Sequence, residues 1–198
     1  MASILKVDTI QDQSGNNIIN ENADTITIGA SGDTVTIPTG ASLTVPNGGL
    51  SGQNYPAFLA VKTSNQSITS GVATKITFDN EILDTDNAYA SDTFTVPTGK
   101  GGTYFIGTLI RSTCGSANHY QYGFCRIYKN GSLLIDQILD LRNNPGLQVS
   151  YNNSSILVLS AGDSLEVRVI ISDVSGSPNV EGNASNQESK FYGFRIGD

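Results

Sequence analysis

Apolar residues alternate with Ser, Thr and other polar residues over short stretches of the whole chain, which is the period of a β-strand. Between residues 56 and 198 this alternation predicts nine strands, separated by turn sequences such as Pro97-Thr98-Gly99 and Lys129-Asn130-Gly131. The predicted strands are Pro56–Lys62, Lys75–Phe78, Thr93–Val96, Thr103–Arg111, Gln121–Tyr128, Ser132–Leu139, Ser154–Leu159, Ser164–Ile171 and Lys190–Ile196. No segment has the pattern of a helix of any length, so the sequence predicts an all-β sandwich or barrel.

The first fifty residues carry a weaker form of the same pattern. Pairs of apolar residues at strand spacing recur every eight or nine residues, and a Gly or Pro turn closes each pair. The pairs are Ile26 with Ile28, Val35 with Ile37 and Leu43 with Val45. Strands this short and polar are marginal in water, so we expect further copies of the same chain to stabilise them; a flexible linker is the alternative. The predicted organisation is a β-repeat stalk at residues 1–50, a hinge at 51–55 and a β-sandwich at 56–198.

Composition narrows the classes of function. The 198 residues are 15% charged with a formal net charge of −7, so no basic stripe is present to bind nucleic acid. No window approaches the roughly 20 apolar residues of a membrane helix, and residues 1–8 lack the apolar core of a secretory leader, which predicts folding in a cytoplasm. Cys114 and Cys125 are too few for a disulfide scaffold; we expect buried reduced thiols, with a local disulfide as the alternative.

Residues that could carry catalysis are scarce. His119 is the single histidine, which excludes a His-based metal cluster, and its setting in Asn118-His119-Tyr120 is typical of a loop. We therefore predict no enzyme activity and no cofactor. Four acidic residues are predicted to lie together on one solvated loop. Ca²⁺ binding by this loop is kept as an alternative, although the residues match no known spacing of calcium ligands. These residues are Asp79, Glu81, Asp84 and Asp86.

Short motifs occur in a fixed order between residues 56 and 198. They are Ala57-Phe58-Leu59-Ala60, Thr77-Phe78, Tyr89, Phe94-Thr95-Val96-Pro97, Gly102-Thr103-Tyr104-Phe105, Lys129-Asn130-Gly131, Gly162-Asp163 and Phe191-Tyr192-Gly193-Phe194-Arg195-Ile196. In this order they resemble the globular head of the C1q/TNF superfamily. The resemblance implies a ten-stranded jelly roll that forms homotrimers, which fits a stalk that needs three chains.

The N-terminal segment has a resemblance of its own. The stretches 5–15 (LKVDTIQDQSG) and 32–38 (GDTVTIP) are similar to the start of tail-fibre and other virion proteins of bacteriophages. This implies a virion protein made in the host cytoplasm, whose N-terminus binds other tail or capsid proteins. The predicted function is a trimeric tail-fibre or receptor-binding protein that attaches to the host cell surface. The alternatives are a capsid decoration or other virion protein that recognises nothing, and a secreted C1q-like ligand or lectin.

Alternating strand direction predicts which residues face a receptor. It places three long connections, Ser112–Tyr120, Asn143–Asn153 and Ser172–Glu188, at the end far from the stalk. Amide and aromatic side chains on such loops are suited to contact a host surface glycan or protein, although the absence of Trp weighs against a lectin. The predicted contact residues are His119, Tyr120, Asn143, Asn144, Tyr151, Asn179 and Asn183.

Aromatic residues on the predicted strands are expected to divide between two structural roles. By strand alternation, one set fills the sandwich and the other faces the trimer axis or solvent. The residues concerned are Phe58, Tyr104, Phe105, Phe191, Tyr192 and Phe194.

Overall fold

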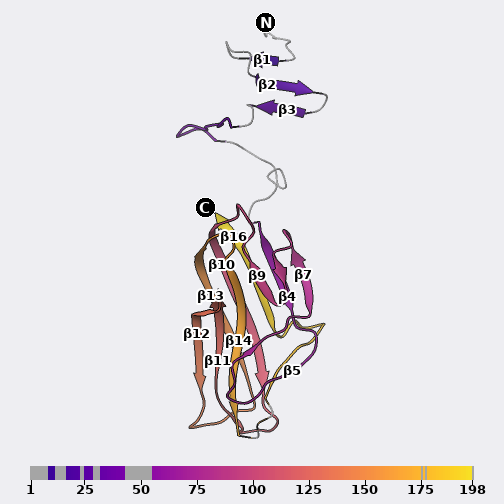
Figure 1. The fold of residues 1–198 in the computed structure, drawn as a ribbon, viewed down its shortest axis with the longest axis vertical. Coiled ribbons are helices and arrows are strands. Elements are labelled where there is room, and N and C mark those ends of the chain that lie inside the picture. Colours follow the sequence, from indigo (N-terminus) through magenta and orange to yellow (C-terminus); the bar gives the residue numbers. More distant parts are fainter. Residues whose placement is uncertain are drawn as a thin grey trace. The chain divides into compact units, whose positions relative to one another are not determined.

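The first fifty residues form a unit of their own. A computed structural model of the chain describes residues 9–11, 17–22, 25–28, 32–42, 55–174, 176 and 178–197, and it divides the chain into two compact units, Met1–Leu50 and Ser51–Asp198. In the first unit, β1 (Thr9–Gln11), β2 (Asn17–Asn22) and β3 (Thr25–Ile28) form an antiparallel sheet in that order (Figure 1).

The repeat predicted in this unit is only partly present. Ile26 and Ile28 lie on β3, but the strand predicted at Val35 and Ile37 is not formed, and both of these side chains are exposed. A strand with two apolar side chains gains too little from burial to form without a partner strand. The third predicted pair, at 43 and 45, lies outside the described residues.

The second unit is a sandwich of two antiparallel sheets. Sheet I has seven strands in the order β5–β15–β10–β16–β4–β7, with β13 also paired to β10. Its strands are β4 (Ala57–Val61), β5 (Gln66–Ser67), β7 (Asn80–Asp84), β10 (Gly102–Thr113), β13 (Gln148–Leu159), β15 (Asn179–Val180) and β16 (Lys190–Gly197). Sheet II has six strands in the order β12–β11–β14–β9–β8, with β6 also paired to β14. Its strands are β6 (Thr74–Lys75), β8 (Tyr89–Ala90), β9 (Thr93–Thr95), β11 (Tyr120–Lys129), β12 (Ser132–Asp140) and β14 (Ser164–Asp173).

The strands that the sequence failed to predict are short or lie at a sheet edge. The segment predicted as an acidic loop contains β7, which pairs with β4 at the edge of sheet I. Most of β7 is exposed, so it has no buried face to impose an alternating pattern. The strand predicted at Lys75–Phe78 shrinks to the two residues of β6. The other long predicted strands are confirmed, several of them extended by one to six residues at an end.

An aromatic cluster joins the two sheets. Phe58 on β4 and Phe94 on β9 stack with ring centroids 4.4 Å apart and planes 13° apart. Phe191 on β16 packs edge-on against Phe58 at 4.9 Å. All three side chains are buried. Offset stacking and edge contacts add to the burial of large apolar area, so this cluster fixes how sheet I lies on sheet II.

The two ends of the second unit differ. At the end where this unit begins and finishes, Arg195 N–H donates to the Pro56 carbonyl at 3.0 Å, and tight turns close the strands (Figure 1). One of these turns is held by Asn130 N–H donating to the Ser164 carbonyl at 2.9 Å. We call this the entry end. The strands β10, β12 and β14 all finish at the opposite end, which carries the long connections and which we call the loop end.

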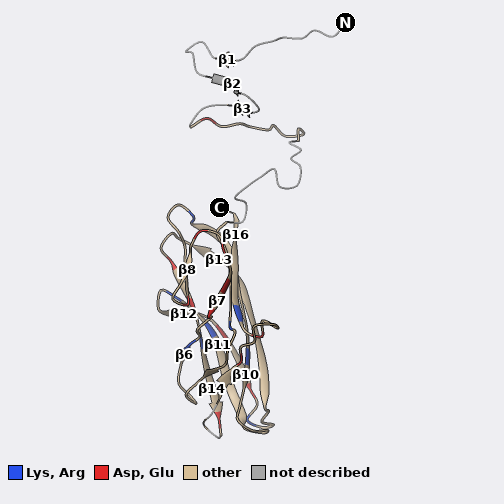
Figure 2. Cartoon of the chain, turned by 90° about the vertical axis from the view of Figure 1, so that its right-hand side faces the viewer, with Lys and Arg blue, Asp and Glu red and all other residues tan. Residues whose placement is uncertain are grey.

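Charged residues are sparse and dispersed in the described part of the chain. Figure 2 shows Lys and Arg as short separate segments among acidic and uncharged ones. The described residues contain no helix, and hence none that is long and apolar enough to cross a membrane. The architecture is therefore all-β, as the pattern of the sequence predicts.

Replacing Phe94 with Ala tests the cluster between the sheets. Because the ring is fully buried and stacked on Phe58, we expect Phe94→Ala to lower the free energy of unfolding by about 3–5 kcal/mol. Urea denaturation of the full chain measures this loss. Val72→Ala, at an exposed turn position, is the control and should cost less than about 0.5 kcal/mol. Equal losses in the two variants would contradict the role given to the cluster.

Candidate functional site

Three connections meet at the loop end of the second unit: residues 114–119, 141–147 and 174–189. Backbone hydrogen bonds tie them together. Cys114 N–H donates to the Leu147 carbonyl at 2.9 Å, and Val174 N–H donates to the His119 carbonyl at 3.1 Å. Tyr120 N–H also donates across to the Gly146 carbonyl at 2.9 Å. These hydrogen bonds join the ends of the three connections to one another at the loop end.

Two of the predicted contact residues are buried in this region. Tyr120 and Tyr151 are 0% and 1% exposed, so neither ring reaches the loop surface and the prediction that they contact a receptor is wrong for both. Both hydroxyls point inward: Tyr120 Oη lies 2.7 Å from Tyr151 Oη and 3.1 Å from Ser112 Oγ. Burial raises the pKa of Tyr120 to about 12 and raises that of Tyr151 further. These hydroxyls form a neutral hydrogen-bonded network inside the sandwich.

Gly123 makes room for that network. A Cβ atom at this position would lie 2.2 Å from Tyr151 Oη and 2.6 Å from Tyr120 Oη. The two tyrosines flank loops in the sequence but are drawn into the core by the space that this glycine leaves on β11. The position of Tyr151, on β13, therefore depends on a residue of β11 that is distant in the sequence.

His119 lies at the loop end with its side chain about one-third exposed. Its Nδ1 atom lies 3.8 Å from Asp173 Oδ1, beyond hydrogen-bond distance, and that carboxylate is fully buried. The Cys114 thiol is hydrogen-bonded to the same carboxylate. The histidine therefore stands on the rim of the loop surface, with one nitrogen turned towards the interior.

The four predicted asparagines have different environments. Asn143 and Asn144 are exposed on the 141–147 loop, where they can meet a partner. Asn179 is part of β15, opposite Ser67 and Thr113, and is half-buried. Asn183 lies beside Lys62 at the end of β4 and caps its own turn, its Oδ1 accepting from the N–H groups of 185 and 186. Of the seven predicted contact residues, the ones best placed for recognition are thus Asn143, Asn144 and the exposed part of the His119 side chain.

A charged cluster that the sequence analysis missed anchors the longest connection. Arg111 on β10 pairs through Nε with Glu181 at 2.7 Å and through Nη1 with Glu188 at 2.9 Å. Its Nη2 donates to Gln148 Oε1 at 2.9 Å. Because the partners come from β13 and from the 174–189 connection, this arginine fastens that connection to the outer face of sheet I.

The outer face of sheet I is apolar near the entry end. Facing positions of β13, β10 and β16 place Ile156, Phe105 and Phe194 side by side, with the Phe105 and Phe194 rings 5.6 Å apart. Ile156 and Val158 are 65% and 80% exposed, and Phe194 and Ile196 are also exposed. We call Phe105, Ile156, Val158, Phe194 and Ile196 the apolar patch.

The six predicted aromatics divide as strand alternation indicates. One set is buried between the sheets and the other lies on the outer face of sheet I. Buried are Phe58, Tyr104 and Phe191; outside are Phe105, Tyr192 and Phe194. The Tyr192 ring lies over Gly107, where a Cβ would come within 2.7 Å of it. Beside this ring is an open cavity of about 380 Å³ lined by Leu59, Lys190 and Tyr192.

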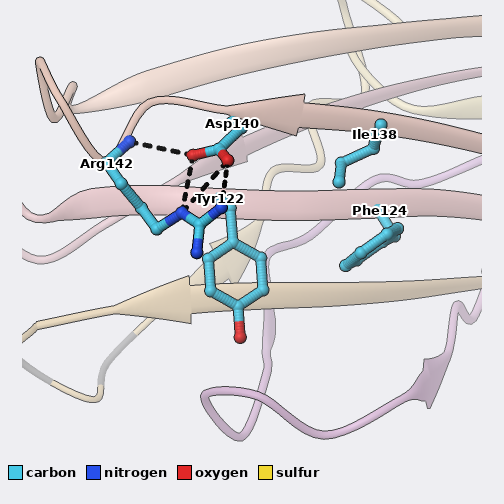
Figure 3. Close-up of a pocket in the computed structure, with 5 residues that line it drawn as sticks. All are labelled: Tyr122, Phe124, Ile138, Asp140 and Arg142. Carbon is cyan, nitrogen blue, oxygen red and sulfur yellow. Dashed lines mark hydrogen bonds and ion pairs between the residues drawn. The ribbon is translucent and has the colours of Figure 1, made fainter.

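The outer face of sheet II carries a second group that the sequence analysis did not single out. Tyr122 and Phe124 on β11 face Asp140 and Ile138 on β12, and Arg142 follows from the adjoining loop. These five side chains line a cavity of about 280 Å³ (Figure 3). The signal was present: Tyr122, Phe124, Arg126 and Tyr128 alternate with inward-facing residues, so large side chains occupy every outward position of this strand.

The acidic residues predicted to share one loop have separate structural roles. Asp79 accepts from Thr63 N–H at 2.6 Å, and Asp84 accepts from the N–H groups of Ala88 and Tyr89 at 2.8 and 2.9 Å. Within the described ranges, no group of three or more His, Cys, Asp or Glu residues is arranged to hold a metal ion. The residues therefore fit hydrogen-bonded turns better than a Ca²⁺ site.

The chain is similar in fold to a solved protein domain. The chain is similar to a solved structure titled "Globular Domain of Zebrafish Complement 1qA protein", with a TM-score of 0.50 and 14% sequence identity. The match covers 72% of this chain and 98% of that one. No protein-family model and no curated protein sequence matches the chain. At this identity the similarity shows the C1q-like fold alone.

The two thiols give a test of the packing around the loop end. Both cysteines are buried and free, as predicted, and burial raises each pKa to about 12. A thiol reacts as its thiolate, so we expect neither to react with Ellman's reagent near pH 8 in the folded full chain. Both should react once the chain is unfolded in guanidinium chloride without reductant. Prompt labelling of the folded chain, or no labelling after unfolding, would contradict this arrangement.

Proposed function

We propose that the chain is a non-enzymatic, trimeric attachment protein, in which the C1q-like unit is the head and residues 1–50 form a stalk. The head associates through the apolar patch of sheet I and recognises its target through the loop end. The finer assignment is a bacteriophage tail-fibre or receptor-binding protein.

The apolar patch is the observation that carries this proposal. Large aliphatic and aromatic side chains that are exposed together on a rigid sheet mark an interaction surface. Two further copies of the chain are the partner we infer. Each copy carries a formal net charge of −7, so copies repel one another except where they meet through uncharged side chains such as these. The C1q-like fold, whose resemblance implies homotrimers, supports three copies.

The first unit supports the same association. Its described apolar side chains are exposed: Ile26 and Ile28 on β3 by 67% and 57%, with Ile10 and Ile19 also open to solvent. A three-stranded sheet with such exposed residues gains stability when copies cover them. This supports a stalk that is stable as three chains.

The geometry of the head supports recognition at the loop end. Within the second unit, the first and last strands, β4 and β16, meet at the entry end, and the long connections lie at the opposite end. Loops held on a rigid scaffold carry recognition more often than the scaffold itself. Three weak contacts, one from each copy, add through effective concentration. The target we propose is a host surface glycan or protein.

The virion assignment rests on the N-terminal sequence resemblance. In that setting the first unit binds another tail or capsid protein, and the chain is made in the host cytoplasm. A capsid decoration protein has the same association without a target. A secreted C1q-like ligand or lectin remains the third reading, which the fold of the head also supports.

A charge placed in the apolar patch tests the proposal. Val158→Asp buries an unpaired carboxylate if the patch is an interface, which should cost about 3 kcal/mol or more per contact. We expect the full-length variant to have the mass of a single chain by light scattering at micromolar concentration. It should also lose the multivalent part of its binding to bacterial cells, measured with labelled protein across a panel of strains.

The matched control is Val72→Asp, which places the same charge at another exposed valine on a turn far from the patch in sequence. This variant should keep the mass of the unmodified chain. If Val158→Asp also behaves like the unmodified chain, the apolar patch is not the interface and the proposal fails.

A further inference from the structure

The cavity on the outer face of sheet II combines an aromatic floor with a polar edge. Tyr122 and Phe124 contact each other edge to face, with ring centroids 6.0 Å apart and planes at 82°. Ile138, 59% exposed, lies opposite Phe124, and Asp140 lies opposite Tyr122. Figure 3 shows the Tyr122 ring beside Arg142 and Asp140 at one end of the cavity, with Phe124 and Ile138 together at the other end.

The polar end is held in place before any ligand arrives. Arg142 donates to Asp140 through Nε at 2.9 and 3.0 Å, through Nη2 and through its backbone N–H at 3.1 Å. The guanidinium also lies 5.7 Å from the centre of the Tyr122 ring. The arginine holds the pKa of Asp140 down at about 2, so the carboxylate stays ionised and accepts hydrogen bonds at neutral and mildly acidic pH.

This arrangement leaves hydrogen-bonding capacity facing solvent. Nη1 of Arg142 makes no hydrogen bond to any described residue. A carboxylate has about four acceptor positions, and three N–H groups of Arg142 donate to Asp140, with Nε shared between both oxygens. The Asp140 and Arg142 side chains are 41% and 64% exposed. A ligand can therefore add one donor to Asp140 and one acceptor to Arg142 without breaking the ion pair.

We propose that this cavity binds one ring of a neutral saccharide, so that the attachment function proposed above, on which this inference rests, is directed at a glycan. A pyranose presents an apolar face of C–H groups and an edge of hydroxyls. The face packs on Tyr122, Phe124 and Ile138. Neighbouring hydroxyls donate to Asp140 and accept from Arg142.

Size and charge favour this class of ligand over others. The cavity of about 280 Å³ lies at the lower limit of small-molecule sites, which span about 300–1,000 Å³, and so suits a single sugar ring. Arg142 is already paired with Asp140, so the cavity offers no unpaired cation to an anionic ligand, and the net charge of −7 disfavours sialylated or phosphorylated ligands. The rings of Tyr122 and Phe124 supply an aromatic stacking surface although the chain contains no Trp.

The position of the cavity fits a role in attachment. Asp140 is the last residue of β12 and Arg142 belongs to the 141–147 connection, so the cavity adjoins the loop end and the exposed Asn143 and Asn144. All five lining residues come from one copy of the chain. Binding of one ring is therefore a property of each copy, and association multiplies it.

Saturation-transfer NMR on the full chain tests the site directly. The probes are methyl α-mannopyranoside, methyl β-galactopyranoside and methyl N-acetyl-β-glucosaminide, with sialic acid and inorganic phosphate as anionic probes. We expect at least one neutral glycoside to bind with a Kd of about 1–10 mM. Tyr122→Ala and Arg142→Ala should each weaken that binding at least about tenfold, a loss typical of a residue at the centre of a contact.

Tyr128→Ala is the matched control. Tyr128 faces outward on the same strand, with the Arg168 guanidinium 4.7 Å from its ring centre, but it does not line the cavity. This variant should bind the glycoside as the unmodified chain does, and unchanged melting of all three variants shows that they fold. No binding of any neutral glycoside, binding of the anionic probes alone, or binding unaffected by the two cavity variants would overturn the proposal.

The result is separable from the test of the proposed function. The cavity belongs to a single copy, so Val158→Asp should bind the monovalent glycoside as tightly as the unmodified chain even when it no longer associates. Loss of association with retained glycoside binding would leave the saccharide site standing alone. Association without glycoside binding would leave the attachment protein standing and remove the saccharide as its target.

Discussion

Sheet I has apolar residues on both of its faces, and the organisation of the second unit follows from this constraint. Its inner face is covered by sheet II, where Phe58 and Phe94 stack between the layers. Its outer face has no such cover near the entry end, where Ile156 and Val158 remain exposed. Apolar area of this kind is stabilising once it leaves water, and nothing within the described second unit removes it. Other copies of the chain are the partner proposed to cover that face.

The two ends of the second unit differ because the tight turns lie at one end and the long connections lie at the other. Tight turns at the entry end leave the long connections at the opposite end, and backbone hydrogen bonds together with the Arg111 cluster hold those connections in place. On the outer face of sheet II, β11 places Tyr122 and Phe124 beside the polar end of β12. The association proposed for sheet I and the recognition proposed for the loop end and sheet II therefore use different surfaces and would not compete.

The alternation of side chains along the sequence predicts which strand residues are buried. It does not predict contacts that depend on how the strands pair. Alternation alone separates buried Phe191 from outward Tyr192, because successive side chains of a strand point to opposite faces. It cannot place Tyr120 and Tyr151, whose burial depends on the space above Gly123. Nor can it predict the cavity on sheet II, since Tyr122 meets Asp140 only through the pairing of β11 with β12. The edge strand β7 was not predicted because most of its residues are exposed. Its sequence therefore does not alternate between apolar and polar residues.

Native mass spectrometry of the unmodified full chain tests the central claim, that copies of the chain cover the outer face of sheet I. We expect a species of three times the 20.9 kDa of the single chain. It should persist at micromolar concentration and at moderate salt, because the proposed contact is apolar rather than ionic. A mass of 20.9 kDa under the same conditions would contradict it. The apolar patch would then need a different partner. The exposed apolar side chains of the proposed stalk would not be covered by other copies of the chain.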